Sequence, residues 1–113
     1  MKPTSSDKYS VAWFKLAECV TRGEQERAFG VYRLLAHSFE DKAFALQLAG
    51  DLYLAFSDSA SAVAKYEMAA QLYQESGRTG EAAAVYEHLY TISPAEKRYK
   101  EAAQVARASV GGP

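Results

Sequence analysis

Apolar and small residues recur along the chain with helical spacing. Ala49 and Gly50 stand beside the larger Leu46 and Tyr53, three or four positions apart. This spacing places the side chains on one face of a helix, and a Gly or Ala at a crossing lets two helices approach closely. No segment keeps a period of two, so we expect no strands. The pattern predicts an all-α chain.

Breaks in the apolar pattern divide the chain into six predicted helices. They fall at Gly23, Glu40, Asp58, Gly77 and Pro94, where glycine, proline and short polar runs favour turns and helix ends. Short turns require neighbouring helices to run antiparallel, so we expect three helical hairpins. The predicted helices span about 8–21, 24–38, 42–56, 60–76, 80–91 and 95–108.

Two of the predicted starts depend on particular residues. Thr79 is expected to cap the fifth helix with its hydroxyl. Ser93 is expected to cap the sixth, with Pro94 in the first helical position.

Residues 1–7 are polar and are expected to be disordered, and residues 110–113 are expected to form a flexible tail. The predicted helical domain is 8–109.

The same residue pattern occurs in three copies. The central copy contains Ala49, Gly50, Tyr53, Ala62, Tyr66 and Ala69. The copy after it contains Ala70, Tyr73, Gly77, Ala82, Tyr86, Leu89 and Pro94. The copy before it contains Trp13, Leu16, Ala17, Val20, Ala28, Tyr32 and Leu35.

Over residues 9–109 this pattern resembles the tetratricopeptide repeat family, whose repeat is a helical hairpin with the signature W-x2-L-G-x2-Y…A-x3-F…P. The resemblance implies about three repeats stacked as a short right-handed solenoid. The repeat phase stays open, because the segment 60–76 fits both the second half of one repeat and the first half of the next.

Composition excludes several classes of partner. The net charge of −1 provides no electrostatic footprint for nucleic acid or a membrane surface. One cysteine cannot form an internal disulfide, which fits a reducing compartment. The first residues lack the apolar core of a secretory signal, and no apolar run approaches the roughly 18 residues that span a membrane. We therefore expect a cytoplasmic protein without membrane insertion.

Residues capable of catalysis or metal binding are isolated from one another. His37 and His88 stand on different predicted helices, each without a second ligand at metal-binding spacing. Cys19 is predicted to pack in the core, with a reactive nucleophile as the alternative. No glycine-rich loop precedes a Lys-Ser/Thr helix start, so no phosphate cradle is expected. The sequence predicts no enzyme activity, metal or cofactor.

The chain has eight tyrosines, which are predicted to act mainly in packing between helices, with their hydroxyls reaching the surface. Tyr9 and Tyr90 fall off the packing positions and are expected to be exposed. The predicted packing residues are Tyr32, Tyr53, Tyr66, Tyr73 and Tyr86.

The family resemblance also implies a binding surface. In tetratricopeptide arrays the first helix of each hairpin lines a concave groove that holds a peptide or a partner helix, and exposed aromatics beside mixed charge suit such a ligand. The alternative is that these side chains pack within the fold or form a solvated face. The matching positions are Phe14, Lys15, Glu18 and Arg22, then Phe44, Gln47, Leu48, Asp51 and Leu54, then Ala83, Ala84, Glu87 and Tyr90.

One ligand class is not expected. Family members that bind chaperone C-termini clamp two carboxylates with Lys, Arg and Asn. The sequence contains no Asn, and only one of the matching positions is basic. Those positions are Val11, Lys15, Leu48, Gly80 and Ala84.

The sequence thus predicts a non-catalytic protein–protein interaction module, a scaffold or adaptor that binds a peptide or helix of another protein. Two alternatives remain. One is a small chaperone for a secreted or assembly subunit. The other is a homo-oligomerisation domain with Phe14 and Phe44 at a homodimer seam.

Overall fold

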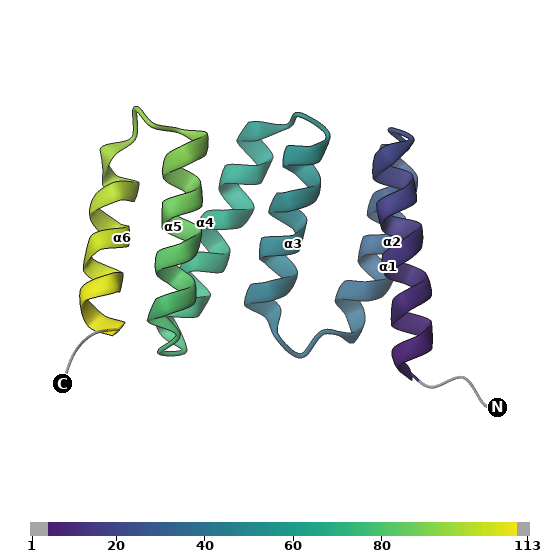
Figure 1. Cartoon of the computed structure of the whole chain (residues 1–113), viewed down its shortest axis with the longest axis horizontal. Helices are drawn as coiled ribbons and strands as arrows, with labels where there is room; N and C mark the ends of the chain where they lie inside the picture. The colour runs from purple at the N-terminus through teal and green to yellow at the C-terminus, as the bar shows by residue number, and fades with distance from the viewer. Residues whose placement is uncertain (1–4, 111–113) are drawn as a thin grey trace.

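The computed structural model describes residues 5–110, with side chains from residue 11 onward, and it confirms the all-α class. No strand occurs within this range. The helices lie in a row in chain order, and the molecule measures 48 × 32 × 16 Å (Figure 1). They are α1 (Ser5–Thr21), α2 (Gln25–Ser38), α3 (Lys42–Ala55), α4 (Ser59–Glu75), α5 (Thr79–Ile92) and α6 (Lys97–Val110).

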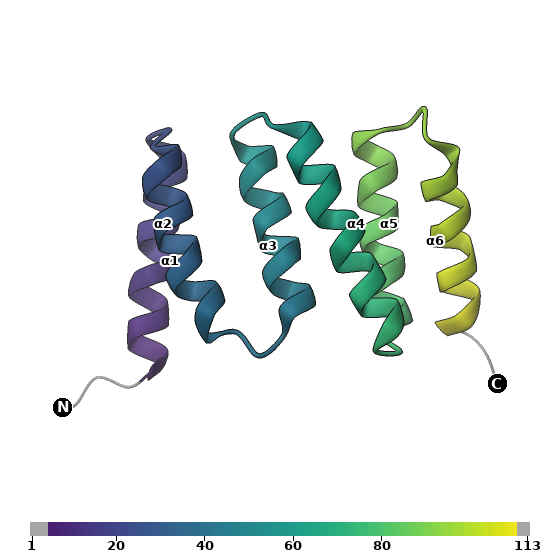
Figure 2. The ribbon, with the colours of Figure 1, turned by 180° about the vertical axis from the view of Figure 1, so that it is seen from behind.

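The helices alternate between two faces of the row. In Figure 1, α1 and α5 lie nearer the viewer than α2 and α4, and the reverse view in Figure 2 brings α2 and α4 to the front. Contacts are dense between α3 and α4, α4 and α5, and α5 and α6, whereas α2 meets α3 at few positions. The α1–α2 hairpin is therefore joined to the rest of the row by a narrow seam.

Most helix bounds differ from the expected ones by only one or two residues. α1 starts at Ser5 and α6 continues to Val110, whereas 8 and 108 were the expected bounds. The remainder of the expected N-terminal and C-terminal segments, 1–4 and 111–113, lies outside the described residues.

The two expected capping residues are wrong. Arg78, not Thr79, occupies the cap of α5, and it makes no side-chain capping bond. Ser93 does not cap α6, because its carbonyl accepts the amide of Glu96 at 3.0 Å. Pro94 therefore stands at the second position of a β-turn, which its fixed backbone angle also favours. The helix begins after this turn, at Lys97.

Three of the inter-helix turns close in the same way. Gly23, Ser57 and Gly77 have positive φ angles of 71°, 64° and 76°. In each turn the next residue's amide bonds to the carbonyl five positions back, as in Asp58 N to Tyr53 O at 2.8 Å. This is the left-handed helix ending that glycine adopts most readily. Ser57 adopts it although it carries a Cβ atom.

The core consists of two clusters. The larger lies within α3 to α6 and is centred on the tyrosines of α4, with Tyr66 and Tyr73 almost fully buried. The smaller joins α1, α2 and α3 around Leu16, Leu35 and Cys19, which confirms the core position predicted for the cysteine. Aromatic rings cross the narrow seam between α2 and α3.

Two contacts illustrate how that seam is closed. The Phe29 ring lies 4.7 Å from the Tyr53 ring, centroid to centroid. The Tyr32 hydroxyl donates to the Ala45 carbonyl at 2.7 Å. Side-chain rings thus fill a space that closer backbones fill elsewhere in the molecule.

The crossing of α3 and α4 depends on Gly50. A Cβ atom at this position would lie 2.7 Å from Cε1 of Tyr66. The Tyr66 ring is buried, and its hydroxyl donates to Asp51, so the ring has no room to move aside. Glycine is required here because the ring lies directly on the backbone.

We expect Gly50→Ala to lower the free energy of unfolding by roughly 1–3 kcal/mol, because the added methyl overpacks the crossing. The matched control is Gly30→Ala in α2, where a Cβ atom meets nothing within 4 Å. That change is expected to raise stability by about 0.5–1 kcal/mol through helix propensity. Urea unfolding of both variants makes the comparison, and equal effects would contradict the assigned crossing.

Ser57 offers a second test. Ser57→Gly is expected to raise the free energy of unfolding by about 1 kcal/mol, because it removes the Cβ strain of a left-handed residue. Ser57→Ala keeps that strain and should bring no gain. Thermal unfolding measures both, and a stabilised alanine variant would show that the serine hydroxyl, not the backbone angle, is unfavourable.

Candidate functional site

An exposed group of aromatic rings lies where α1 meets the turn between α2 and α3. The Trp13 and Phe39 rings stack with centroids 6.2 Å apart, and Phe39 meets Phe44 at 5.5 Å with its plane inclined by 60°. Trp13 is 37% exposed and Phe44 is 39% exposed. The rings line a hollow of about 550 Å³, here called the aromatic pocket, whose residues are Trp13, Ser38, Phe39, Glu40, Asp41 and Phe44.

The local sequence explains how the turn presents two of these rings. Phe39 has extended backbone angles immediately after α2, and its amide bonds to the Ala36 carbonyl at 3.1 Å. Asp41 then caps α3, because its side chain accepts the Phe44 amide at 3.1 Å. The cap places Phe44 in the first turn of α3, close to Phe39.

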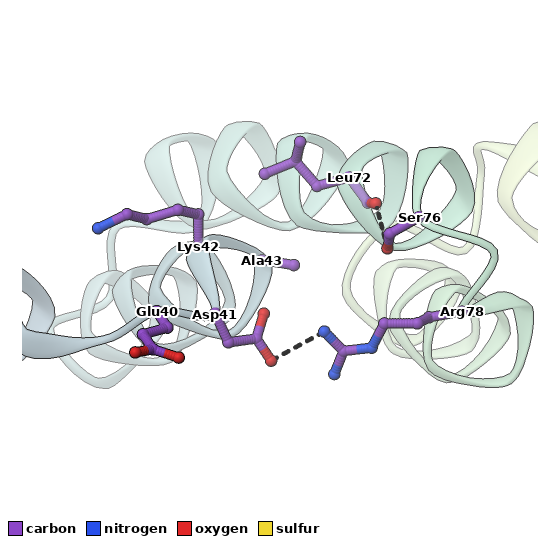
Figure 3. A pocket seen from close by; sticks show the side chains of 7 residues that line it. All are labelled: Glu40, Asp41, Lys42, Ala43, Leu72, Ser76 and Arg78. Atoms are coloured by element: carbon purple, nitrogen blue, oxygen red, sulfur yellow. Dashed lines mark hydrogen bonds and ion pairs between the residues drawn. The ribbon is translucent and has the colours of Figure 1, made fainter.

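A second hollow, of about 590 Å³, adjoins the first and is called the charged pocket. It is lined by Glu40, Asp41, Lys42, Ala43, Leu72, Ser76 and Arg78, drawn in Figure 3. Glu40 and Asp41 line both hollows, so the two form one surface with an aromatic side and a charged side.

Arg78 ties the charged pocket together. Its guanidinium donates to Asp41 at 2.9 Å and also pairs with Glu81. The same group lies over the Tyr73 ring, 4.6 Å from the centroid. Because Arg78 comes from the α4–α5 turn, this ion pair connects the start of α3 to the start of α5.

Glu40 and Lys42 differ from Asp41 in this respect. In Figure 3 the Glu40 carboxylate and the Lys42 ammonium both point away from Arg78. Neither forms an ion pair with any side chain from residue 11 to residue 110. Their charges therefore face solvent at the rim of the site.

The environment of Asp41 shifts its ionisation. Burial opposes the charged form, but the Phe44 amide and the Arg78 guanidinium outweigh it and lower the pKa of Asp41 below its ordinary value. Burial, with the nearby Asp41 charge, raises the pKa of Tyr73. Asp41 is thus held as a carboxylate and Tyr73 as a neutral phenol at neutral pH.

The candidates predicted on α1 stay outside the aromatic pocket. Phe14 is 72% exposed but does not line the hollow. Lys15, Glu18 and Arg22 are exposed, and Glu18 pairs with Arg22 at 3.1 Å. They form a solvated helix face beside one prominent phenylalanine.

Of the candidates predicted on α3, Phe44 alone lines the aromatic pocket. Gln47 accepts the Tyr73 hydroxyl at 2.9 Å, and Asp51 accepts the hydroxyl of Tyr66. Leu48 is buried, and Leu54 packs against the larger core cluster. The two polar side chains expected to face a partner, Gln47 and Asp51, thus accept hydrogen bonds from tyrosines of α4.

The candidates predicted on α5 also differ from one another in exposure. Ala83 is buried, and Ala84 is exposed. Glu87 is exposed and pairs with Arg107 of α6 at 2.7 Å. The expectation that Tyr90 is exposed is wrong, because the ring is half-buried and packs against the larger core cluster. Tyr9 has no described side chain.

Sequence reasoning missed Trp13, Phe39 and Arg78 as site residues. Trp13 belongs to the repeat pattern of the sequence, yet more than a third of its surface is exposed. The available signal was local: Phe39 and Phe44 flank a capping aspartate, which predicts two rings at one helix start.

The histidines and the other residues able to ligate a metal are the remaining candidates for chemistry. In the part of the chain that the structure describes, no group of three or more His, Cys, Asp or Glu is placed to hold a metal. His37 is exposed, and His88 stands edge-on to the Tyr66 ring at 4.9 Å. Within the described range, no helix has both the length and the apolar character needed to cross a bilayer.

Comparison of the chain with models of protein families, with curated proteins and with solved structures finds no match.

The Asp41–Arg78 pair can be tested by titration. A carboxyl with a lowered folded pKa contributes stability that is present above its unfolded pKa of about 4 and is lost as pH falls through the folded value. We expect Arg78→Gln to raise the pKa of Asp41, so that the stability contributed by this carboxyl is smaller and its loss is complete at a higher pH than in the wild type. Carboxyl ¹³C NMR titration measures the pKa directly.

The control for this titration is Arg22→Gln, which removes an ion pair of α1 and should leave Asp41 unchanged. An Asp41 pKa that is the same in Arg78→Gln and in the wild type would show that the helix cap alone sets it.

Proposed function

We propose that this protein is a non-catalytic, tetratricopeptide-like module that binds a peptide or helix of another protein. The observation that carries the proposal is the aromatic pocket, in which more than a third of Trp13 and of Phe44 stays exposed. Aromatic side chains dominate protein interfaces energetically, and a concave apolar pocket with a polar rim is a typical docking site.

The repeat arrangement is supported by equivalent positions in the first two hairpins. Gly23 and Ser57, thirty-four positions apart, close the two hairpin turns with the same left-handed backbone. Ala28 and Ala62, also thirty-four apart, are both 0% exposed at the start of the second helix of each hairpin. Thirty-four residues is the period of the tetratricopeptide repeat. We infer a short right-handed solenoid whose phase pairs α1 with α2, α3 with α4 and α5 with α6.

The mechanism we propose is docking on a preformed surface. Trp13 comes from a helix, Phe44 from the first turn of another, and Phe39 from the short turn that the Asp41 cap fixes. Rings held in this way lose little conformational entropy when a partner covers them, so more of the contact energy contributes to affinity.

Self-association is the second candidate. Phe14 is 72% exposed on α1 and Leu34 is 75% exposed on α2, so the outer hairpin carries large apolar groups outside the aromatic pocket. Two copies could bury these groups against each other, with Phe14 at the seam. This reading assigns the protein a structural role.

The test compares the wild type with a Phe14→Glu/Phe44→Glu variant and with a Met68→Glu/Val105→Glu control. All four positions carry exposed apolar side chains, but the control pair lies on α4 and α6. We expect proteins captured by the wild type and by the control to be absent from the Phe14/Phe44 variant. Affinity purification with quantitative mass spectrometry compares the captured sets, and circular dichroism verifies folding.

Light scattering over a concentration range distinguishes the two candidates. A wild-type monomer supports docking of a different protein. A dimeric wild type together with a monomeric Phe14/Phe44 variant would support self-association instead. Identical captured sets from all three proteins would overturn the proposed binding surface.

A further inference from the structure

The aromatic pocket has acidic walls as well as aromatic ones. Its lining includes the rings of Trp13, Phe39 and Phe44 together with Glu40 and Asp41. The faces of aromatic rings attract cations through their quadrupole, most strongly for tryptophan. A carboxylate beside such rings adds direct attraction for the same charge.

No cation of this chain lines the pocket within the described residues. Its remaining lining residue is Ser38, and the neighbouring Lys42 and Arg78 line the charged pocket instead. The Asp41 charge is shared with Arg78 at 2.9 Å. The Glu40 carboxylate points away from Arg78 (Figure 3), and Glu40 is exposed.

Two other hollows in the described part of the chain lack this combination. The hollow of about 440 Å³ between α4 and α6 also contains a carboxylate and tyrosine rings, but Arg98 pairs with Glu67 there at 2.9 Å. The hollow on the outer side of α2 contains Arg27, Arg33 and His37 and would repel a cation. Charge complementarity therefore favours the aromatic pocket for a cationic group.

We propose that the aromatic pocket binds the side chain of a lysine or arginine carried by the partner protein. This inference depends on the proposed function, and it adds the chemical class of the residue that docks. The cation lies against the exposed rings of Trp13 and Phe44 and is paired by Glu40. An aliphatic stem of that side chain covers the apolar lining, as long basic side chains commonly do.

Trp13 makes the proposal directly measurable, because it is the single tryptophan of the chain. Its fluorescence and its indole N–H resonance report on this pocket alone. The probes are Nα-acetyl-lysine methylamide, Nα-acetyl-arginine methylamide and the neutral Nα,Nε-diacetyl-lysine methylamide, titrated into the full chain at constant ionic strength. The neutral probe keeps the stem and removes the charge.

We expect saturable shifts with the lysine and arginine probes, with dissociation constants of the order of millimolar, and at least about fivefold weaker binding of the neutral probe. Glu40→Gln should weaken the lysine probe several-fold, because it keeps the shape of the side chain and removes its charge. The matched control Glu101→Gln, an exposed carboxylate on α6, should bind the probe as the wild type does.

Phe44→Leu provides a second variant, and it keeps Trp13 as the fluorescent reporter. It removes one ring, keeps an apolar side chain and should also weaken the lysine probe. Equal binding of the charged and neutral probes, or no shift with any of them, would overturn the proposal. The partner-capture experiment tests the proposed function separately, because it compares the captured proteins, whereas this titration compares charged with neutral probes.

Discussion

The packing of Tyr66 on the bare backbone of Gly50 is the contact on which the rest of the row depends. It draws α3 and α4 together, and the Asp51 carboxylate holds the hydroxyl of the same ring. Burial and that hydrogen bond raise the pKa of Tyr66, so the ring remains a neutral donor. α5 packs on the other side of α4, and α6 on α5. A close α3–α4 crossing therefore sets the position of every later helix.

Helix number, type and most bounds could be predicted because they depend on local signals. Gly23 and Gly77 follow a helix end and adopt the left-handed conformation that glycine takes without strain, and Asp41 caps α3 through the amide of its near neighbour Phe44. The start of α6 could not be fixed in this way. Pro94 suits the first position of a helix and the second of a β-turn equally well, and only the Ser93–Glu96 hydrogen bond distinguishes them.

The site was harder to predict for a different reason. Periodicity shows which residues share a face of a helix, but it does not show which side chains arrive from elsewhere. Gln47 and Asp51 do share the expected face with Phe44, yet both accept hydrogen bonds from tyrosine hydroxyls of α4. Conversely, Trp13 and Phe39 lie far apart in the sequence and meet only through the fold. The surface combines a helix, a turn and a helix start, which no single sequence window contains.

The narrow seam between α2 and α3 has a consequence for how the molecule responds to an occupant. Trp13 belongs to the outer hairpin, whereas Phe44 belongs to the inner helices, and the aromatic pocket lies across the join between them. A ligand that contacts both rings adds contacts across the weakest junction of the row. By linkage, its binding free energy also opposes separation of the hairpin. If the pocket binds as proposed, the stability of the junction between the first two helices and the rest would increase with ligand concentration.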